Sequence, residues 1–286
     1  MTRICYLLLF LPCLLESQIS VPTYVGARAT SLGGHYLTLT GADATLGNVA
    51  GTARLEQTAV AVGAERRFGL DVLQQIAAGA AVPTSIGAFG LALNQSGNAD
   101  YREQRVGLTY ARPVAETMTL GVRFDALRLD QREYGARTIA QAELGLQAEV
   151  TSTLRLGMTY RQPFVREIIE GETIASQIAL GVDYRVGELA LLVLSVEKTE
   201  DFPFRLRTGV EYEFADGLIA RAGIATGAAR VGTTGGGQVE YAFGLGWQFT
   251  EQFRLDVGTS RHSVLDWSPG LTVIFGPAAV GQPAGR

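Results

Sequence analysis

The chain has little of the chemistry from which metal and redox centres are built. Of its 286 residues only two are cysteine, Cys5 and Cys13, and only two are histidine, His35 and His262. A transition-metal site needs three or four thiolate, imidazole or carboxylate ligands together, and two isolated histidines do not supply them. Both cysteines stand near the N-terminus, so no disulfide framework is expected beyond it. The sequence therefore predicts neither a metal centre nor a cofactor.

Charged residues and long apolar runs are also scarce. Asp, Glu, Lys and Arg make up 18% of the chain, below the roughly 25% of ordinary soluble proteins. The net charge of -4 gives no sign of a nucleic-acid partner. No later run reaches the roughly 18 apolar residues of a transmembrane helix. Few charges together with 35 glycines are typical of a β-rich or membrane protein.

The first residues are typical of an export signal. Arg3 supplies the positive start, residues 4–15 are apolar, and a small residue suited to cleavage follows. We predict that residues 1–20 are removed on export, which would leave the mature chain without cysteine. Lipidation at Cys13 is an alternative, although Pro12 before it does not fit a lipoprotein signal.

The dominant pattern between Thr58 and Phe275 is alternation of apolar with small or polar residues. It is regular in residues 204–214 and 239–249, for example. A period of two is typical of strands with one apolar and one polar face. About fourteen such runs occur, and an even number of strands with roughly ten residues each is expected of a bacterial outer-membrane barrel. A break in the alternation at Ala126 and Leu127 predicts a β-bulge.

The connections favour a membrane barrel over a secreted soluble β-sandwich, whose strands also alternate. Short turns such as 112–113 and 216–217 follow every second strand, and longer polar loops such as 94–100 and 227–237 follow the others. This asymmetry predicts that both termini lie on the periplasmic side. Aromatic residues beside the short turns would form an interfacial girdle. They are Tyr110, Tyr184, Phe214, Phe249 and Phe253.

A motif precedes the first predicted strand. It reads Gly-Ala-Arg-Ala-Thr-Ser-Leu-Gly-Gly in 26–34, Gly-Ala-Asp-Ala in 41–44 and Asn-Val-Ala-Gly in 48–51. It resembles the N-terminal signature of PorV/PorQ-like outer-membrane proteins, within the FadL-like barrel group. Val49 replaces the usual proline, the acidic segment is shorter, and His35 replaces a small residue. The resemblance implies a 14-stranded barrel with an N-terminal plug. Its motif residues are Gly26, Arg28, Gly33, Gly34, Asn48 and Gly51.

The predicted organisation is therefore all-β: a transmembrane antiparallel β-barrel of about fourteen strands with an N-terminal plug-like segment. We place the plug-like segment at 21–56, the barrel at 57–276 and a periplasmic tail at 277–286. Phe275 would end the last strand, and an aromatic residue there suits insertion by the barrel-assembly machinery, as the family resemblance implies. The other expected partner of the barrel wall is outer-membrane lipid.

The polar face carries the candidate site, because it would line the lumen. Its charges are Arg105, Arg123, Asp125, Glu143, Arg155, Arg161, Asp183, Arg185, Arg205, Arg207, Glu211, Glu213, Arg221, Glu240, Arg254 and Asp256. A pore selective for one sign would show a ring of that sign. The near balance instead predicts ion pairs across a largely filled lumen, and it argues against the apolar pocket that fatty-acid transport needs. Many other inward positions are glycine, which eases curvature or makes room for the plug.

Two functions remain open. The first is passive or gated transport of small solutes past the plug, in a porin-like manner. The second, which the resemblance implies, is a non-conducting scaffold or shuttle for secreted proteins in type IX secretion. An apolar loop is the candidate docking site, although it could instead fold over the lumen as a lid or extend its strands; its residues are Phe164, Val165, Ile168 and Ile169. Catalysis is not expected, since His262 with its neighbouring serines is a lone loop histidine without an established base–nucleophile geometry.

Overall fold

The computed structural model describes residues 24–276 apart from 134, 163–166, 170–171, 174, 201 and 228–238. The predicted signal peptide (1–20) and tail (277–286) lie outside these residues, as do Phe164, Val165 and the side chains of Ile168 and Ile169.

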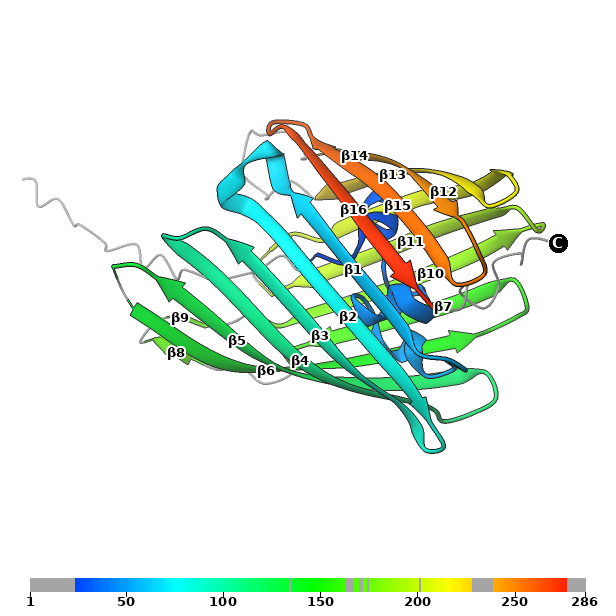
Figure 1. Cartoon of the computed structure of the whole chain (residues 1–286), viewed down its shortest axis with the longest axis horizontal. Coiled ribbons are helices and arrows are strands. Elements are labelled where there is room, and N and C mark those ends of the chain that lie inside the picture. Colours follow the sequence, from blue (N-terminus) through cyan, green and yellow to red (C-terminus); the bar gives the residue numbers. More distant parts are fainter. Residues whose placement is uncertain are drawn as a thin grey trace, which may run out of the picture.

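Fourteen strands of the described chain close into one antiparallel barrel in which each strand pairs with its neighbours in sequence order (Figure 1). They are β1 (Ala59–Arg66), β2 (Gln74–Thr84), β3 (Gly87–Gly97), β4 (Tyr101–Pro113), β5 (Met118–Gln131), β6 (Gly135–Glu149), β7 (Leu154–Arg161), β10 (Gln177–Val186), β11 (Ala190–Thr199), β12 (Arg205–Ala215), β13 (Leu218–Gly227), β14 (Val239–Gln248), β15 (Phe253–His262) and β16 (Trp267–Phe275). A separate hairpin consists of β8 (Glu167–Ile169) and β9 (Glu172–Thr173). The predicted fold class and strand number are confirmed.

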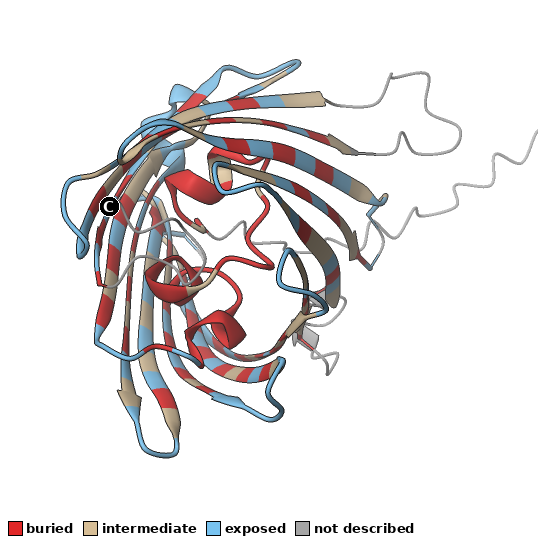
Figure 2. Cartoon of the chain, turned by 90° about the vertical axis from the view of Figure 1, so that its right-hand side faces the viewer, coloured by how far each residue is buried: buried red, intermediate tan, exposed pale blue. Residues whose placement is uncertain are grey.

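Alternation places the large apolar side chains on the outside of the barrel. In β14, Phe243, Leu245 and Trp247 are about half exposed, while Ala242 and Gly246, at alternate positions, are buried. Figure 2 shows the same alternation of exposed and buried positions along the strands. In a membrane the exposed apolar face meets lipid, and closure leaves no strand edge with unpaired backbone groups. A closed barrel with an apolar exterior is the architecture expected of an outer-membrane protein.

The bulge predicted in β5 is wrong. Residue pairing with β4 and β6 continues through Ala126 and Leu127 without a shift. The pattern breaks there because the inward positions of Leu127 and Leu129 are apolar and buried, not because the strand changes phase. The irregular register lies instead in β12, between Glu213 and Ala215 where it pairs with β13.

The two rims of the barrel differ, although less than the sequence predicts: the longer loop expected at 94–100 is wrong, because β3 extends to Gly97 and β4 begins at Tyr101. Tight turns join β2–β3, β4–β5, β6–β7, β10–β11, β12–β13 and β14–β15 at the end where β1 begins and β16 finishes. We call this the inner rim and the opposite one the outer rim. Aromatic side chains are exposed near the inner rim at Tyr184, Phe214, Phe249 and Phe253. Tyr110 lies there too, with its hydroxyl donating to Ile86 O at 2.6 Å.

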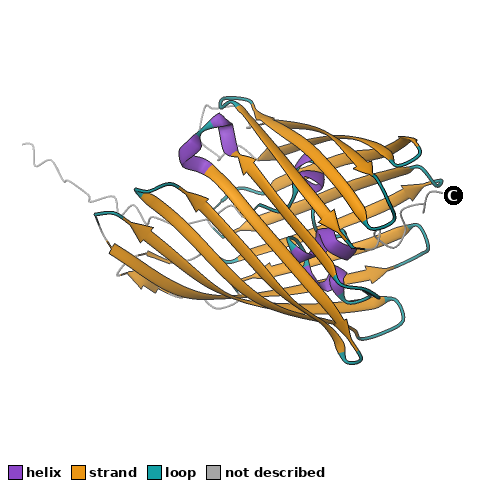
Figure 3. Cartoon of the chain, in the orientation of Figure 1, coloured by secondary structure: helices purple, strands orange, loops and turns teal. Residues whose placement is uncertain are grey.

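Residues 24–56, here called the luminal segment, lie inside the barrel (Figures 2 and 3). The segment contains one short α-helix and two 3₁₀-helices, α1 (Ala27–Ser31), η1 (Gly41–Thr45) and η2 (Val49–Thr52); two more, η3 (Arg67–Gly69) and η4 (Asp71–Leu73), join β1 to β2 at the outer rim. No helix in the described ranges is long and apolar enough to cross a membrane. Tyr24, the first described residue, lies within the lumen, where its hydroxyl donates to Leu271 O at 2.9 Å.

Candidate functional site in the barrel lumen

Glycines on the inward face let the luminal segment pack directly against the wall. A methyl group at Gly209 would lie 2.9 Å from Leu32 Cα, and one at Gly121 would lie 2.7 Å from Ala50 N. Inward glycines that meet the luminal segment in this way are Gly121, Gly145, Gly157, Gly181, Gly209, Gly223, Gly244 and Gly258. Most of the glycines on the polar face are therefore needed for this close contact.

The segment has its own glycines where it turns against the wall. Gly33 has a φ of +70°, and a side chain there would meet Ile224 O at 2.8 Å. Gly34 is also left-handed, with a φ of +85°, and Gly26, with a φ of +97°, precedes α1. Gly51 is packed against Leu39 O and cannot accept a side chain.

Amide side chains hold the middle of the segment. The Asn48 amide donates to Leu37 O at 2.8 Å and to Leu146 O of β6 at 3.1 Å. From β6, the Gln147 amide donates to Leu37 O and Leu39 O, each at 2.9 Å. The bonds to Leu37 O and Leu39 O satisfy carbonyl groups that the short, irregular segment leaves without helical partners. Asn48 thus ties two parts of the segment to each other and to the wall.

Six buried charged side chains form a closed ring in which positive and negative groups alternate. This charge ring runs in order through Arg28, Glu211, Arg221, Asp256, Arg254 and Asp43, and returns to Arg28. Arg28 donates to both carboxylate oxygens of Glu211, at 2.7 and 2.8 Å, and to Asp43 at 2.8 Å. The two ring members from the luminal segment, Arg28 and Asp43, therefore contact wall residues more than 180 positions away in sequence.

The wall completes the ring with residues of β12, β13 and β15. Arg221 donates to Glu211 at 2.6 Å and to Asp256 at 2.7 Å. Arg254 donates to Asp256 at 2.8 Å and to Asp43 at 2.6 Å. No side chain of the ring is more than 8% exposed. Charges this deeply buried are tolerated because every one of them is paired and hydrogen-bonded.

Burial and charge shift the pKa values of two groups in the luminal segment. Burial alone would raise the pKa of Asp43, but the guanidinium groups of Arg254 and Arg28 hold it below its usual range. Burial, together with the positive charges of Arg207 and Arg28, lowers the pKa of His35 to about 3. His35 is therefore a neutral ring at physiological pH, with its Nε2 2.7 Å from Thr38 Oγ1.

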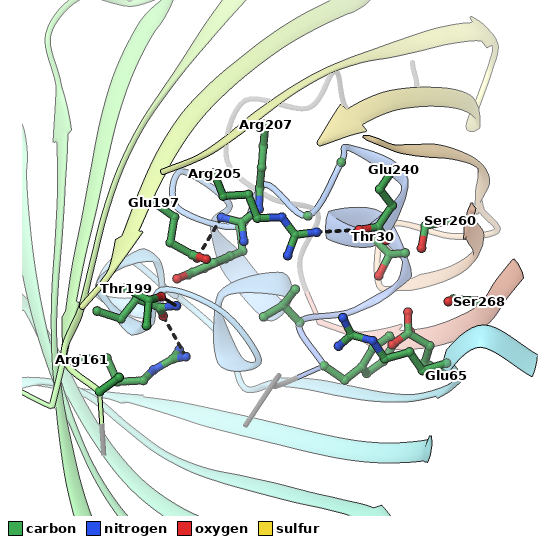
Figure 4. A pocket seen from close by; sticks show the side chains of 18 of the residues that line it. Thr30, Glu65, Arg161, Glu197, Thr199, Arg205, Arg207, Glu240, Ser260 and Ser268 are labelled. Atoms are coloured by element: carbon green, nitrogen blue, oxygen red, sulfur yellow. Dashed lines mark hydrogen bonds and ion pairs between the residues drawn. The ribbon is translucent and has the colours of Figure 1, made fainter. Parts of the chain in front are cut away.

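A cavity of about 220 Å³ lies on the outer side of the luminal segment. Figure 4 shows side chains from several strands converging on it. The charged ones are Glu65, Arg67, Arg105, Arg161, Glu197, Arg205, Arg207 and Glu240. Arg205 pairs with Glu240 at 2.5 Å, and Arg207 pairs with Glu197 at 2.9 Å. This outer cavity is a charged, hydrogen-bonding compartment.

A second group of charges, here called the wall cluster, borders the outer cavity on β4 to β7. It consists of Arg105, Arg123, Asp125, Glu143 and Arg161. Glu143 is fully buried and accepts from Arg123 at 2.8 Å and from Arg161 at 2.7 Å. Arg123 also reaches Asp125 at 3.3 Å. The strand register brings them together, since Glu143 lies opposite both Arg123 and Arg161.

Another cavity, of about 270 Å³, lies on the inner side of the luminal segment. Residues of the segment such as Thr40, Ala50 and Leu55 line it together with residues near the β4–β5 and β6–β7 turns. The inner and outer cavities share no lining residue. Between them lie fully buried residues of the segment, including Leu37 and Asn48. Residues of the luminal segment line both cavities, and each cavity uses a different part of it.

The remaining residues predicted to line the lumen lie nearer the inner rim. Arg155 is 3.6 Å from Glu149 and 3.9 Å from Asp183, and it donates to Thr38 O at 3.1 Å. Arg185 is half-buried on β10. Glu213 is half-buried on β12 and accepts from Gly217 N at 3.0 Å. All sixteen predicted residues are buried or half-buried.

Three important residues were not predicted as site residues. Asp43 lies in the Gly-Ala-Asp-Ala stretch of the N-terminal motif, and its position as the acidic residue of that stretch could have suggested an ion pair. Glu197 is on the inward face of β11, but apolar residues on both faces of that strand obscured its phase. Gln147 is polar and inward on β6, and only the path of the luminal segment reveals its two bonds.

His262, the histidine weighed above for catalysis, lies at the end of β15. His262 Nδ1 accepts from the backbone N–H groups of Val264 and Leu265, at 3.2 and 3.3 Å, so it caps its own loop. Within the described ranges no three His, Cys, Asp or Glu side chains are placed to share a metal ion.

The comparisons with known proteins identify the fold. The sequence matches no family model and no curated protein. Solved structures do match: the CymD monoaromatic hydrocarbon channel has a TM-score of 0.68 at 11% identity, covering 88% of this chain and 97% of that one. The toluene transporter TodX of Pseudomonas putida has a TM-score of 0.64 at 12% identity, covering 90% and 98%. A FadL homologue of Pseudomonas aeruginosa has a TM-score of 0.69 at 12% identity, covering 91% and 100%.

At this low identity the likeness establishes the fold, which is that of FadL-like outer-membrane barrels. These neighbours are described as channels and transporters, not enzymes. Membership of the PorV/PorQ-like group is not shown, and the comparisons give no support to a role in type IX secretion.

Proposed function

We propose that the protein is an outer-membrane channel for the uptake of small molecules, and that the luminal segment acts as its plug. The observation that carries the proposal is that a buried segment inside one lumen lines both an outer and an inner cavity, with a different part at each. A solute that enters from outside would reach the outer cavity and would pass only when the luminal segment moves. The solved channels of the same fold support this proposal through their described activities.

The fold neighbours suggest small organic molecules as cargo, since they are described as carrying monoaromatic hydrocarbons and toluene. The outer cavity differs from an apolar pocket, because it is lined by five arginines and three glutamates. The inner cavity has fewer charges, with Ala50 and Leu55 among its lining residues. We therefore propose organic solutes that carry a polar group. Contact with outer-membrane lipid and insertion by the barrel-assembly machinery, for which Phe275 lies at the end of β16, form part of the same proposal.

A reversible cross-link tests the role of the plug. A Cβ atom at Gly145 would lie 3.4 Å from Asn48 Cγ, so the double variant Asn48→Cys/Gly145→Cys should form a disulfide between the luminal segment and β6. The only natural cysteines, Cys5 and Cys13, lie in the predicted signal peptide. We expect the oxidised protein to be closed in planar bilayers. Reduction of the disulfide should open the channel. The luminal segment is then no longer cross-linked to β6, and it also lacks the hydrogen bonds of the Asn48 amide.

Two outcomes would contradict the proposal. Equal conductance in the oxidised and reduced states would show that the luminal segment does not gate the lumen. Folded, inserted protein without conductance in either state would favour a non-conducting scaffold. The single variant Asn48→Cys is the matched control, since it loses the same amide without forming the cross-link.

A further inference from the structure

Polar side chains line the outer cavity on opposite sides. Figure 4 shows Arg161 and Thr199 on one side of it and Glu65, Ser260 and Ser268 on the other. The first two come from β7 and β11, which in the strand order lie across the barrel from β1, β15 and β16. A ligand that fills the cavity would therefore meet hydrogen-bonding groups at both of its ends. A molecule with a single polar group would leave one side unmatched.

Two buried polar atoms of the lining have no hydrogen-bond partner within the described residues. One is the Nε–H donor of Arg207 on β12, whose Nη1 pairs with Glu197 at 2.9 Å. It lies beside Gly34, where a side chain would come within 3.2 Å of it. The other is the amide oxygen of Gln141 on β6. Arg207 and Gln141 are each 7% exposed, and both line the cavity. A buried polar atom without a partner costs free energy, and a ligand with a matching group would remove that cost.

These two atoms need opposite partners, because one donates and the other accepts. A hydroxyl group suits both, since its O–H donates one bond and its oxygen can accept two. It also matches either face of the Gln141 amide. Hydroxyl groups of the lining have the same dual character. Thr199 Oγ1 accepts from Gln177 at 3.1 Å and Ser268 Oγ accepts from Phe68 N at 2.9 Å, so each has an O–H with which to donate.

The charged side chains of the lining are largely engaged with one another. Arg205 pairs with Glu240 at 2.5 Å and Arg207 with Glu197 at 2.9 Å, while Arg161 donates to a carboxylate of the wall cluster at 2.7 Å. A charged ligand of either sign would compete with these partners. A hydroxyl group instead bonds to the remaining lone pairs and N–H groups, and no ion pair has to break. The lining therefore favours an uncharged ligand.

We propose that the outer cavity binds a small uncharged polyol, of the class of a monosaccharide, whose hydroxyl groups bond to Arg207 Nε–H and to the Gln141 amide. The volume of about 220 Å³ is below the roughly 300–1,000 Å³ of pockets for drug-sized ligands and suits a compact molecule. Tyr24 and Tyr36 also line the cavity and offer apolar surface to a carbon skeleton. This inference rests on the proposed function, because it names the class of solute.

Calorimetric titration of the purified protein tests the site without any variant. An amine-oxide detergent is used, because it has no sugar headgroup that would compete. The probes are glucose and myo-inositol, compared with glucuronate, glucosamine and cyclohexanol. We expect saturable binding of at least one polyol that changes little with added salt and is roughly tenfold or more tighter than binding of the other three. Equal or tighter binding of glucuronate, glucosamine or cyclohexanol would overturn the proposal, as would the absence of binding by both polyols.

Variants then locate the site. Gln141→Met removes the amide but keeps most of the volume, so it should lower the affinity for the bound polyol roughly fivefold to tenfold. The affinity for cyclohexanol should not fall, whereas a general distortion of the cavity would weaken both. The control is Gln104→Met, because Gln104 is on the outward face of β4, where its amide donates to Gln95 at 3.0 Å. Unchanged polyol affinity in folded Gln141→Met would refute the assignment.

A second variant keeps the test decisive if Gln141→Met does not fold. Arg207→Lys retains the positive charge beside Glu197 but has no Nε–H. It should weaken polyol binding by a similar factor, and wild-type affinity in this variant would equally refute the assignment.

The binding and transport results can fail separately. Polyol binding that depends on Gln141, in a protein that conducts neither ions nor the polyol before or after reduction of the cross-link, would keep the site and refute the channel. Conductance that opens on reduction, without preference for either polyol over cyclohexanol, would keep the channel and refute the site.

Discussion

Replacing Arg28 with methionine should release the luminal segment while the barrel stays closed. Arg28 makes three hydrogen bonds to two carboxylates, and its side chain is 4% exposed. Methionine keeps most of the volume but removes the charge, which leaves the charge ring with two cations and three anions. Removing one partner of a buried ion pair costs about 3–5 kcal/mol. The free energy that docks the segment should fall by an amount of this size.

Hydrogen exchange of residues 24–56 in detergent measures that loss directly. A loss of about 3 kcal/mol accelerates exchange through local opening roughly a hundredfold, since each 1.4 kcal/mol is about tenfold. Exchange in the barrel strands should change little. The matched control is Arg132→Met, whose pair with Asp100 is largely exposed and worth under about 1 kcal/mol. Conductance in planar bilayers should rise in Arg28→Met if the segment is the plug.

A second substitution distinguishes charge from packing. Asp43→Asn in the Arg28→Met background restores neutrality to the ring and still offers Arg254 an amide oxygen. The double variant should therefore be more stable than the sum of the single losses predicts, by about 1–3 kcal/mol. If Arg28→Met leaves exchange of the segment unchanged, or if the two losses simply add, the ring does not hold the segment in the way proposed.

Three further predictions concern packing, pH and lipid contact. Gly157→Ala places a methyl group against Leu37 O, so it should displace the segment and accelerate its exchange without opening the β7 ladder; unaltered exchange would contradict this. The pKa of His35 is about 3 in the folded chain against 6.5 in the unfolded one. Between pH 3 and pH 6.5 the unfolded chain therefore binds a proton at His35 that the folded chain does not. Docking should therefore weaken as the pH falls from 6.5 towards 3, and His35→Gln should flatten this slope in exchange measured against pH. Phe124 is 65% exposed on the outer face of β5, and Phe124→Arg should destabilise the barrel in refolding into lipid by about 2–4 kcal/mol; a negligible effect would argue that lipid does not cover it.

The strands were predictable because each has one face towards lipid. Lipid-facing positions require apolar side chains and recur at every second residue, so Phe243, Leu245 and Trp247 indicate both a strand and its outward face. Where the inward face is apolar as well, as at Leu127, the same reasoning failed and predicted a bulge that is not there. The loop lengths carried independent information, because the turns at one rim are short whatever the strands contain.

The contents of the lumen were only partly predictable. Balanced charges on the polar face pointed to ion pairs, and the inward glycines pointed to a close neighbour. Which charges pair depends on closure of the barrel and on the path of the luminal segment. Arg28 and Glu211 are 183 positions apart, and nothing local in the sequence joins them. Asp43, although part of the N-terminal motif, becomes a site residue only when α1 and η1 bring it beside Arg28.

The division of charge in the ring would suit the proposed plug, which has to leave the lumen and return. Arg28 and Asp43 pair with each other at 2.8 Å and together carry no net charge. The four wall residues are two arginines and two carboxylates, so together they also carry no net charge. They stay paired with one another, because Arg221 bonds both Glu211 and Asp256, and Arg254 bonds Asp256. Withdrawal of the whole segment therefore breaks two contacts, Arg28 to Glu211 and Arg254 to Asp43, without stranding an unpaired charge in either part. Loss of a single ring member does strand one. As far as the charge ring is concerned, withdrawal of the intact segment therefore leaves both parts neutral, whereas truncation of one ring member leaves an unpaired buried charge.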